Sequence, residues 1–177
     1  AAALATAAQD NSTATPPHGK WASRNSSPLL LFVCSGNTCR SPMAEALMRA
    51  RLPPACRWKI GSAGTLAGDG LPASLLAQQA MAEQGLSLAA HRSRPVTPDL
   101  VREAGLVVVM GRHHFERIIA CSPAARDKVF LLGRFSPREA GLEIDDPAGG
   151  PLADYRQCRD EINACLPGLT AFLDVLA

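Results

Sequence analysis

Apolar residues gather in four short runs along the chain, at residues 29–33, 58–63, 106–110 and 129–132. Each run is short and bounded by turn-forming residues, which is typical of buried strands. The stretches between the runs are longer, and their apolar positions recur at helical spacing. The pattern therefore predicts strands that alternate with helices.

The first helix shows this spacing at Met43, Ala46, Leu47 and Ala50, and Pro53 marks its end. Further helices are expected over residues 72–84, 97–105, 115–120 and 153–176, the last with a bend at Pro167. Alternating strands and helices predict an α/β fold in which helices cover both faces of a parallel sheet.

Residues 1–28 differ from the rest, because they are rich in Ala, Ser, Thr, Asn and Pro and contain one acidic residue, Asp10. Such a stretch cannot bury a core, so we predict a disordered leader or linker, followed by one domain over residues 29–177. Its Ser-rich, acid-poor composition also loosely resembles an organelle transit peptide. Because the chain does not begin with Met, we expect a processed form or a fragment.

Composition narrows the function classes. The chain has 177 residues, 47% of them hydrophobic, and a formal net charge of +2, so we expect no nucleic-acid partner. No apolar run is long enough to span a membrane. Its six cysteines show neither regular spacing nor a Cys-x-x-Cys pair, which indicates a reduced, cytoplasmic protein, expected to be a monomer.

The first predicted strand runs directly into the sequence Cys34-Ser35-Gly36-Asn37-Thr38-Cys39-Arg40-Ser41. We expect Ser41 to cap the following helix and Pro42 to occupy its first position. A strand, a tight loop and a helix N-terminus together form an anion site, since loop amides and the helix dipole both favour negative charge. Gly36 and Asn37 are best able to take the left-handed backbone that such a loop needs.

Cys34 and Arg40 turn this anion site into a candidate catalytic site. The positive field favours the thiolate of Cys34, which is a nucleophile. The planar guanidinium of Arg40 matches two oxygens of a phosphate group. A cysteine alone is more often an inert buried side chain, so the prediction of phosphoryl transfer to sulfur rests on the whole string.

A phosphatase of this kind also needs an acid that protonates the leaving group. Asp145-Asp146-Pro147 lies between the fourth strand and the last helix, and Pro147 favours an extended Asp146. From spacing alone, an ordinary Asp-Pro turn is an equally good interpretation.

The string from Val33 to Ala46 resembles the signature of low-molecular-weight protein tyrosine phosphatases, and the similarity extends from about Leu29 to the C-terminus. The resemblance implies a three-layer sandwich with a four-stranded parallel sheet, and a phosphate loop after the first strand. It also implies hydrolysis through a phosphocysteine intermediate, without metal or cofactor, with Cys34 as nucleophile, Arg40 as phosphate clamp and Asp146 as general acid and base. The implied phosphate-binding residues are Ser35, Gly36, Asn37, Thr38, Cys39 and Ser41.

The same resemblance implies a network that holds Asn37 through Ser41, Ser62 and His91, and so locks a strained loop. Ser41 is also expected to hydrogen-bond Cys34. We interpret the remaining histidines as surface residues that bind no metal: His18, His113 and His114.

The substrate is expected to be a protein carrying phosphotyrosine or phosphoarginine. Thr38 and the stretch from Asp146 to Gly150 are similar to the bacterial branch that acts on phosphoarginine, since tyrosine-directed members carry a larger aliphatic residue in place of Thr38. Ala148 departs from both groups, which usually present an aromatic wall there. We therefore expect a shallower, more permissive mouth.

Two other functions stay open. An arsenate reductase-like thiol enzyme shares this loop but needs two further cysteines, and residues 62–120 contain none. A non-catalytic phosphate-binding module fits poorly with the joint presence of Cys34, Arg40 and Asp146. For Cys39, a protective disulfide with Cys34 and simple packing under the loop are equal alternatives.

Overall fold

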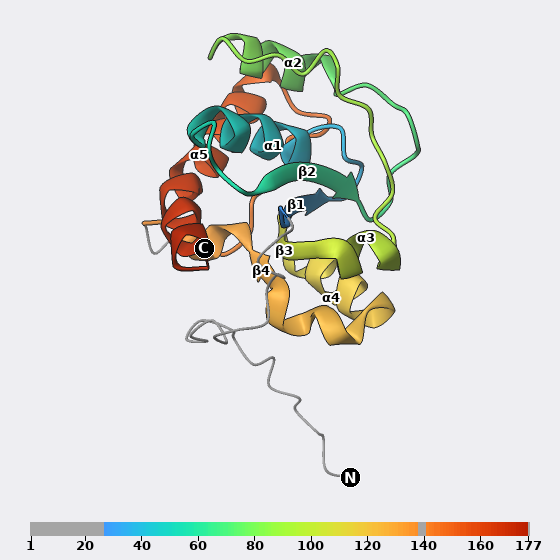
Figure 1. The fold of residues 1–177 in the computed structure, drawn as a ribbon. Helices are drawn as coiled ribbons and strands as arrows, with labels where there is room; N and C mark the ends of the chain where they lie inside the picture. Colours follow the sequence, from blue (N-terminus) through green and yellow to red (C-terminus); the bar gives the residue numbers. More distant parts are fainter. Residues whose placement is uncertain (1–26, 138–140, 177) are drawn as a thin grey trace.

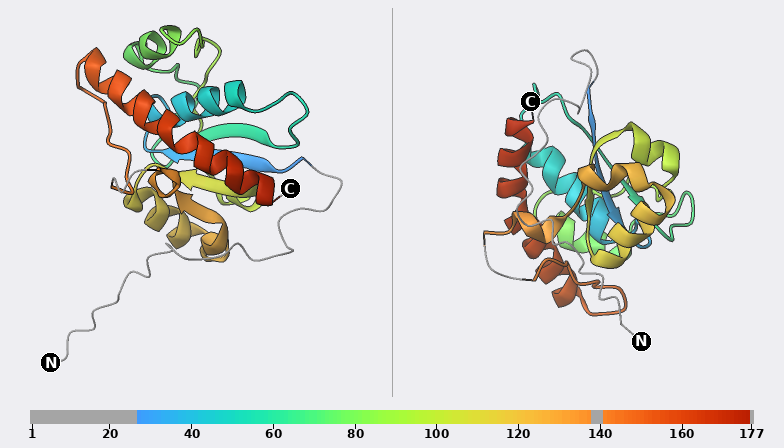
Figure 2. Two further views of the ribbon diagram at one scale, coloured as in Figure 1. Left: turned by 90° about the vertical axis from the view of Figure 1, so that its left-hand side faces the viewer. Right: turned by 90° about the horizontal axis from the view of Figure 1, so that it is seen from below.

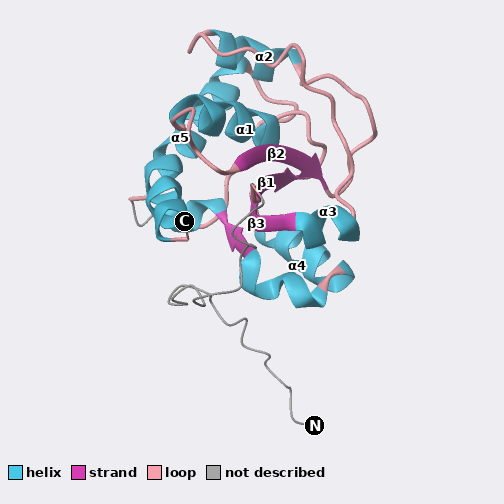
Figure 3. Cartoon of the chain, viewed as in Figure 1, coloured by secondary structure: helices cyan, strands magenta, loops and turns pink. Residues whose placement is uncertain are grey.

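The computed structural model describes residues 27–137 and 141–176, which form a parallel sheet between two layers of helices (Figures 1 and 3). The strands are β1 (Leu29–Cys34), β2 (Lys59–Gly64), β3 (Ala104–Val109) and β4 (Val129–Leu131). Their order in the four-stranded sheet is β2-β1-β3-β4, and every neighbouring pair is parallel. The central position of β1 places its carboxyl end, where Cys34 lies, between the ends of two neighbouring strands.

The α-helices are α1 (Arg40–Arg51), α2 (Leu75–Ala82), α3 (Pro98–Glu103), α4 (Arg112–Cys121) and α5 (Leu152–Val175). Two short 3-10 helices, η2 (Pro123–Lys128) and η3 (Leu132–Phe135), flank β4. Helices α1, α2 and α5 lie on one side of the sheet, and α3 and α4 lie on the other (Figure 1).

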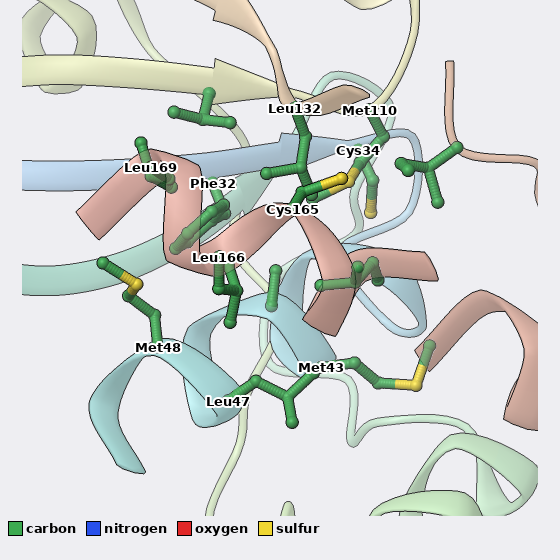
Figure 4. Packing of buried hydrophobic residues seen from close by; sticks show 14 of the residues in the cluster. Phe32, Cys34, Met43, Leu47, Met48, Met110, Leu132, Cys165, Leu166 and Leu169 are labelled. Carbon is green, nitrogen blue, oxygen red and sulfur yellow. The ribbon is translucent and has the colours of Figure 1, made fainter. Parts of the chain in front are cut away.

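The alternation of side chains along β1 explains why helices pack on both faces of the sheet. Leu30, Phe32 and Cys34 belong to the core beneath α1 and α5, whereas Leu31 and Val33 belong to the core beneath α3 and α4. Figure 4 shows Phe32 and Cys34 in the first of these cores, together with side chains of α1 and α5. Both faces of β1 are therefore apolar, as expected of a central parallel strand.

The predicted α/β class and the four-stranded parallel sheet are confirmed. Two predicted helices begin three residues away from their observed starts. Helix α2 begins at Leu75, because the Ser74 hydroxyl accepts a hydrogen bond from the Ala77 amide and caps it there. Helix α4 begins at Arg112, directly after the extended Gly111.

Helix α5 continues through Pro167 to Val175 as one long helix across the sheet (Figure 2). Most of the predicted leader, residues 1–26, lies outside the described residues. Among the described helices, none combines the length and the apolar character that a membrane crossing requires.

Candidate active site

Residues 35–39 join β1 to α1 in a tight loop that curls around the sulfur of Cys34. Asn37 takes a left-handed backbone, with φ of 54°, as its residue type allows. Its amide then donates a hydrogen bond to Cys34 Sγ at 3.3 Å, and Ser41 Oγ lies 3.0 Å from the same sulfur. Two polar groups thus contact a thiol that is only 2% exposed.

The buried side chain of Asn37 ties the loop to three other segments. Its Nδ2 donates to Ser41 Oγ and Ser62 Oγ, both at 2.9 Å, and its Oδ1 accepts from the Arg94 amide at 2.9 Å. His91 Nε2 lies 2.7 Å from the Asn37 carbonyl oxygen. The structure therefore brings together the residues expected around Asn37 and adds Arg94.

Glu45 is a further member of this network, which the sequence pattern did not predict. Its Oε2 accepts a hydrogen bond from Ser62 Oγ at 2.6 Å, and it also pairs with Arg49 on the same helix. Glu45 lies one helical turn after Ser41, and residues four apart in a helix share a face. This spacing in the sequence could have predicted that Glu45 lies near the loop.

The backbone of β2 packs directly against the loop at Gly64. A Cβ atom at this position would lie 2.4 Å from the Ser35 carbonyl oxygen and 2.8 Å from the Asn37 nitrogen. The strand extension after Gly64 also donates hydrogen bonds from Thr65 to the Cys34 carbonyl and from Leu66 to the Ser35 carbonyl, each at 2.9 Å. Only glycine lets β2 support the loop at this distance.

Arg40 connects the loop to the predicted acid. Its Nη2 donates to the Asp146 carboxylate and, at 3.3 Å, to Ser35 Oγ, while its Nη1 donates to the Ile144 carbonyl at 3.2 Å. The side chain is 4% exposed. Its Nε is buried and has no hydrogen-bond partner among the described residues.

Asp146 is 43% exposed at its side chain, so its carboxylate faces both Arg40 and solvent. Its Oδ1 accepts a hydrogen bond from the Ala148 amide at 3.2 Å, which fixes the carboxylate in the turn. Asp145 is exposed and Pro147 is buried. Of the two aspartates, only Asp146 pairs with Arg40.

The expectation that Ser41 caps α1 is wrong. The helix begins at Arg40, with Cys39 as its N-cap residue and no capping hydrogen bond from a side chain. The Ser41 hydroxyl contacts Cys34 and Asn37 instead, so it does not accept from the helix backbone. Pro42 is consequently the third helical residue, where its missing N–H costs nothing because the first turn lacks intrahelical acceptors.

The expectation of a surface position is wrong for His114, which is fully buried. Its Nε2 lies 2.9 Å from Ser35 Oγ. Burial, with the nearby His113 and Arg40, lowers the pKa of His114 to about 3, so the ring is neutral at neutral pH. A signal was present in the sequence, since Ile118 lies four residues later and shares its buried face. His113 is exposed as expected, and His18 lies outside the described residues.

Cys39 lies beneath the loop, where its thiol donates to Ser74 Oγ at 3.3 Å and contacts the Tyr155 hydroxyl at 3.9 Å. Burial raises the pKa of Tyr155, so this hydroxyl is neutral. The six cysteines all lie in the described part of the chain and are free thiols. The packing alternative for Cys39 agrees with these contacts, and the disulfide with Cys34 stays a prediction.

Known proteins are similar in sequence to this chain. The profile of the low molecular weight phosphotyrosine protein phosphatases matches residues 29–175. A protein-arginine-phosphatase of Geobacillus stearothermophilus is 41% identical over 140 residues, which are 79% of this chain and 92% of that protein. The low molecular weight protein-tyrosine-phosphatase Etp of Escherichia coli K12 is 35% identical over 131 residues, 74% of this chain and 80% of Etp.

Solved structures agree with these sequence relatives. The YwlE arginine phosphatase from Geobacillus stearothermophilus superposes with a TM-score of 0.76 at 38% identity, covering 84% of this chain and 94% of YwlE. A YwlE mutant with a phosphorylated active-site serine superposes with a TM-score of 0.74 at 37% identity, covering 82% and 95% of the two chains. The chain therefore belongs to the low molecular weight phosphotyrosine protein phosphatase family.

Proposed function

We propose that this protein phosphatase uses Cys34 as its nucleophile, Arg40 as its phosphate clamp and Asp146 as its general acid and base. The observation that carries the assignment is the position of Arg40. Its guanidinium contacts the loop around the Cys34 sulfur through Ser35 and also contacts the Asp146 carboxylate. Nucleophile, clamp and acid thus meet at the carboxyl end of one strand, where ligands bind in parallel α/β sheets.

In the first step, the Cys34 thiolate attacks phosphorus in line with the leaving group. The S–P bond forms as the bond from phosphorus to the substrate oxygen or nitrogen breaks, and Asp146 gives its proton to the departing atom. Arg40 and the loop amides hold the equatorial oxygens of the transferring group. The product is phosphocysteine and the dephosphorylated side chain.

In the second step, the Asp146 carboxylate takes a proton from water, and the water oxygen attacks phosphorus. The S–P bond breaks, which releases inorganic phosphate and returns Cys34 as the thiolate. The Asn37 amide and the Ser41 hydroxyl contact Cys34 Sγ and so stabilise the charge on the departing sulfur.

The phosphate group binds in the loop formed by Ser35, Gly36, Asn37, Thr38, Cys39 and Ser41. Backbone amides of this loop and the N-terminus of α1 favour the anion. The buried Nε of Arg40 supplies a further donor for a phosphate oxygen. Ser62 and His91 support the site indirectly, because both contact Asn37.

The substrate is a phosphorylated protein, and we assign phosphoarginine as the preferred residue. Thr38 supports this choice, because its small polar side chain leaves room for a planar guanidinium where a larger aliphatic group would favour a phenyl ring. The named relatives include both arginine and tyrosine phosphatases, so phosphotyrosine is the competing substrate.

We further propose that residues 29–177 act as one monomeric domain in the cytoplasm, preceded by a leader or linker over residues 1–28. Six free thiols support a reduced compartment. The small net charge of +2 supports a protein partner rather than a nucleic acid.

The first experiment compares turnover of a phosphoarginine peptide and a phosphotyrosine peptide by the wild type, Cys34→Ser and Cys121→Ser. We expect Cys34→Ser to lose turnover, and Cys121→Ser, which changes an exposed thiol, to retain it. Rapid acid quenching and mass spectrometry should place the phosphoryl group on Cys34 in the wild type. Full activity in Cys34→Ser would refute the mechanism.

A further inference from the structure

We propose that His114 is a positioning residue that holds the Ser35 hydroxyl and, through it, the guanidinium of Arg40. The inference rests on the proposed function, in which Arg40 binds the phosphate group. His114 belongs to α4, on the opposite face of the sheet from α1, and it reaches the loop at the carboxyl end of β1. The catalytic loop is therefore supported from both faces of the sheet.

The contacts form a continuous chain. His114 Nε2 lies 2.9 Å from Ser35 Oγ, and Arg40 Nη2 donates to the same oxygen at 3.3 Å. His114 and Arg40 are both buried, with relative exposures of 0% and 3%. Two side chains on different helices thus meet on one hydroxyl group of the loop.

We assign the direction of the two hydrogen bonds as follows. Arg40 has only donors, so the Ser35 oxygen accepts from it, and the Ser35 hydroxyl donates its hydrogen to His114 Nε2. This arrangement requires a neutral ring whose Nε2 carries no proton. Burial and the positive charge of Arg40 keep the ring neutral.

His114 is costly as a mere packing residue. Its Nδ1 is buried and has no hydrogen-bond partner among the described residues. An unsatisfied buried polar atom destabilises a fold, and an apolar side chain on the Ile118 face would avoid that cost. A role in orienting Ser35 explains why a histidine stands there.

Ser35 matters because it can hold Arg40 throughout the reaction. The contact of Arg40 with Asp146 must loosen when Asp146 turns to the leaving group, whereas the contacts with Ser35 and the Ile144 carbonyl need not change. A guanidinium held in advance stabilises the transition state without reorganisation. Loss of His114 should therefore lower kcat and also weaken the binding of inorganic phosphate.

The test compares His114→Phe, His114→Gln and Ile118→Ala with the wild type. Phe removes the acceptor, Gln places an amide oxygen near the position of Nε2, and Ile118→Ala disturbs the packing of α4 without touching Ser35. For His114→Phe we expect kcat to fall roughly 10-fold or more, and the Kd for inorganic phosphate to rise. Gln should restore much of both, and Ile118→Ala should change kcat less than about 2-fold at a comparable loss of stability.

Ser35→Ala gives an independent measurement. If His114 acts through Ser35, the double variant Ser35→Ala/His114→Phe should lose no more kcat than the more damaging single variant. Additive losses, or equal losses in His114→Phe, His114→Gln and Ile118→Ala, would show that His114 is only structural.

The phosphate Kd separates failure of this proposal from failure of the proposed function. A wild type that hydrolyses neither phosphopeptide would refute the function, yet its affinity for inorganic phosphate would still report the position of Arg40. An active wild type and a His114→Phe variant with unchanged kcat and phosphate Kd would overturn the role of His114 alone.

Discussion

Arg40 and Asp146, 106 positions apart in the sequence, form an ion pair in which Arg40 Nη2 donates to Asp146 Oδ2. The pair lets the buried guanidinium and the half-exposed carboxylate compensate each other's charge. In the proposed mechanism, a phosphate dianion competes with Asp146 for Arg40, so we expect substrate binding to free the carboxyl group for proton transfer. The proposed clamp and the proposed acid are thus coupled through one contact.

Removal of the Asp146 carboxylate should lower the rate of the chemical step without weakening the binding of phosphate. We expect Asp146→Ala to lower kcat on phosphopeptides roughly 10²- to 10⁴-fold, because the leaving atom then departs without a proton donor. Inorganic phosphate should bind as well as before or more tightly, since Arg40 loses its competitor. Steady-state kinetics and calorimetry check both.

Substrates with different leaving groups show whether Asp146→Ala removes the proton donor or merely distorts the site. Hydrolysis of p-nitrophenyl phosphate should suffer less than that of phosphopeptides, because p-nitrophenolate needs little protonation. An equal loss on both substrates would argue against Asp146 as the acid.

Thr38 should decide between the two substrates. Its side chain lies at the half-buried rim of the loop, with Oγ1 3.8 Å from Cys39 Sγ and next to Gly36. Thr38→Ile adds bulk there, so we expect the ratio of kcat/KM for phosphoarginine to phosphotyrosine peptides to fall by about 10-fold or more. Thr38→Ser keeps the hydroxyl and is the matched control, and an unchanged ratio in Thr38→Ile would remove Thr38 from specificity.

Gly64→Ala should distort the loop around Cys34, which packs directly against Gly64. The added Cβ would press on the Ser35 carbonyl and the Asn37 nitrogen, which are backbone atoms and cannot rotate away. We expect a stability loss of about 1–3 kcal/mol in urea unfolding, and a kcat loss larger than that stability loss explains. Gly141→Ala, where a Cβ meets no atom within 4 Å, is the control and should leave both quantities unchanged.

Acid should destabilise the fold through His114. Its pKa is about 3 in the folded state and 6.5 as a free side chain, so the unfolded chain binds more protons between these values. The stabilisation is complete above pH 6.5 and declines as the pH falls toward 3. Between pH 7 and 5 the wild type should lose roughly 1–2 kcal/mol more unfolding free energy than His114→Phe, by chemical denaturation at both pH values. Parallel losses would contradict a neutral, buried ring.

Strands and helices could be predicted because burial imposes a clear period on this sequence. The two-sided core around β1 appears as an unbroken apolar run, and Thr97-Pro98 marks the start of α3 as predicted. The start of α1 could not be placed from capping rules, because Ser41 uses its hydroxyl for Cys34 and Asn37. The preference of serine for the N-cap position is weaker than the hydrogen bonds that Ser41 makes with Cys34 and Asn37.

Side-chain partners across the fold were harder to predict. Cys34, Arg40 and Asn37 lie in one continuous string, so their proximity follows from the sequence. Glu45 and His114 are each linked to the site by one hydrogen bond, to Ser62 and to Ser35, and these bonds depend on how the helices pack on the sheet. A buried polar residue and an exposed one look alike in a sequence until the packed face is known.

The Asn37 network makes catalytic competence a test of complete folding. Its partners come from α1, from β2 and from the segment that carries His91 and Arg94 beside the edge of the sheet. If this edge segment opens, the left-handed backbone of Asn37 loses its support, although the thiol of Cys34 remains. A partly opened molecule thus carries every chemical group of the proposed site without the support that holds Asn37, and we expect it to hydrolyse no phosphoprotein until the edge segment has closed on the loop.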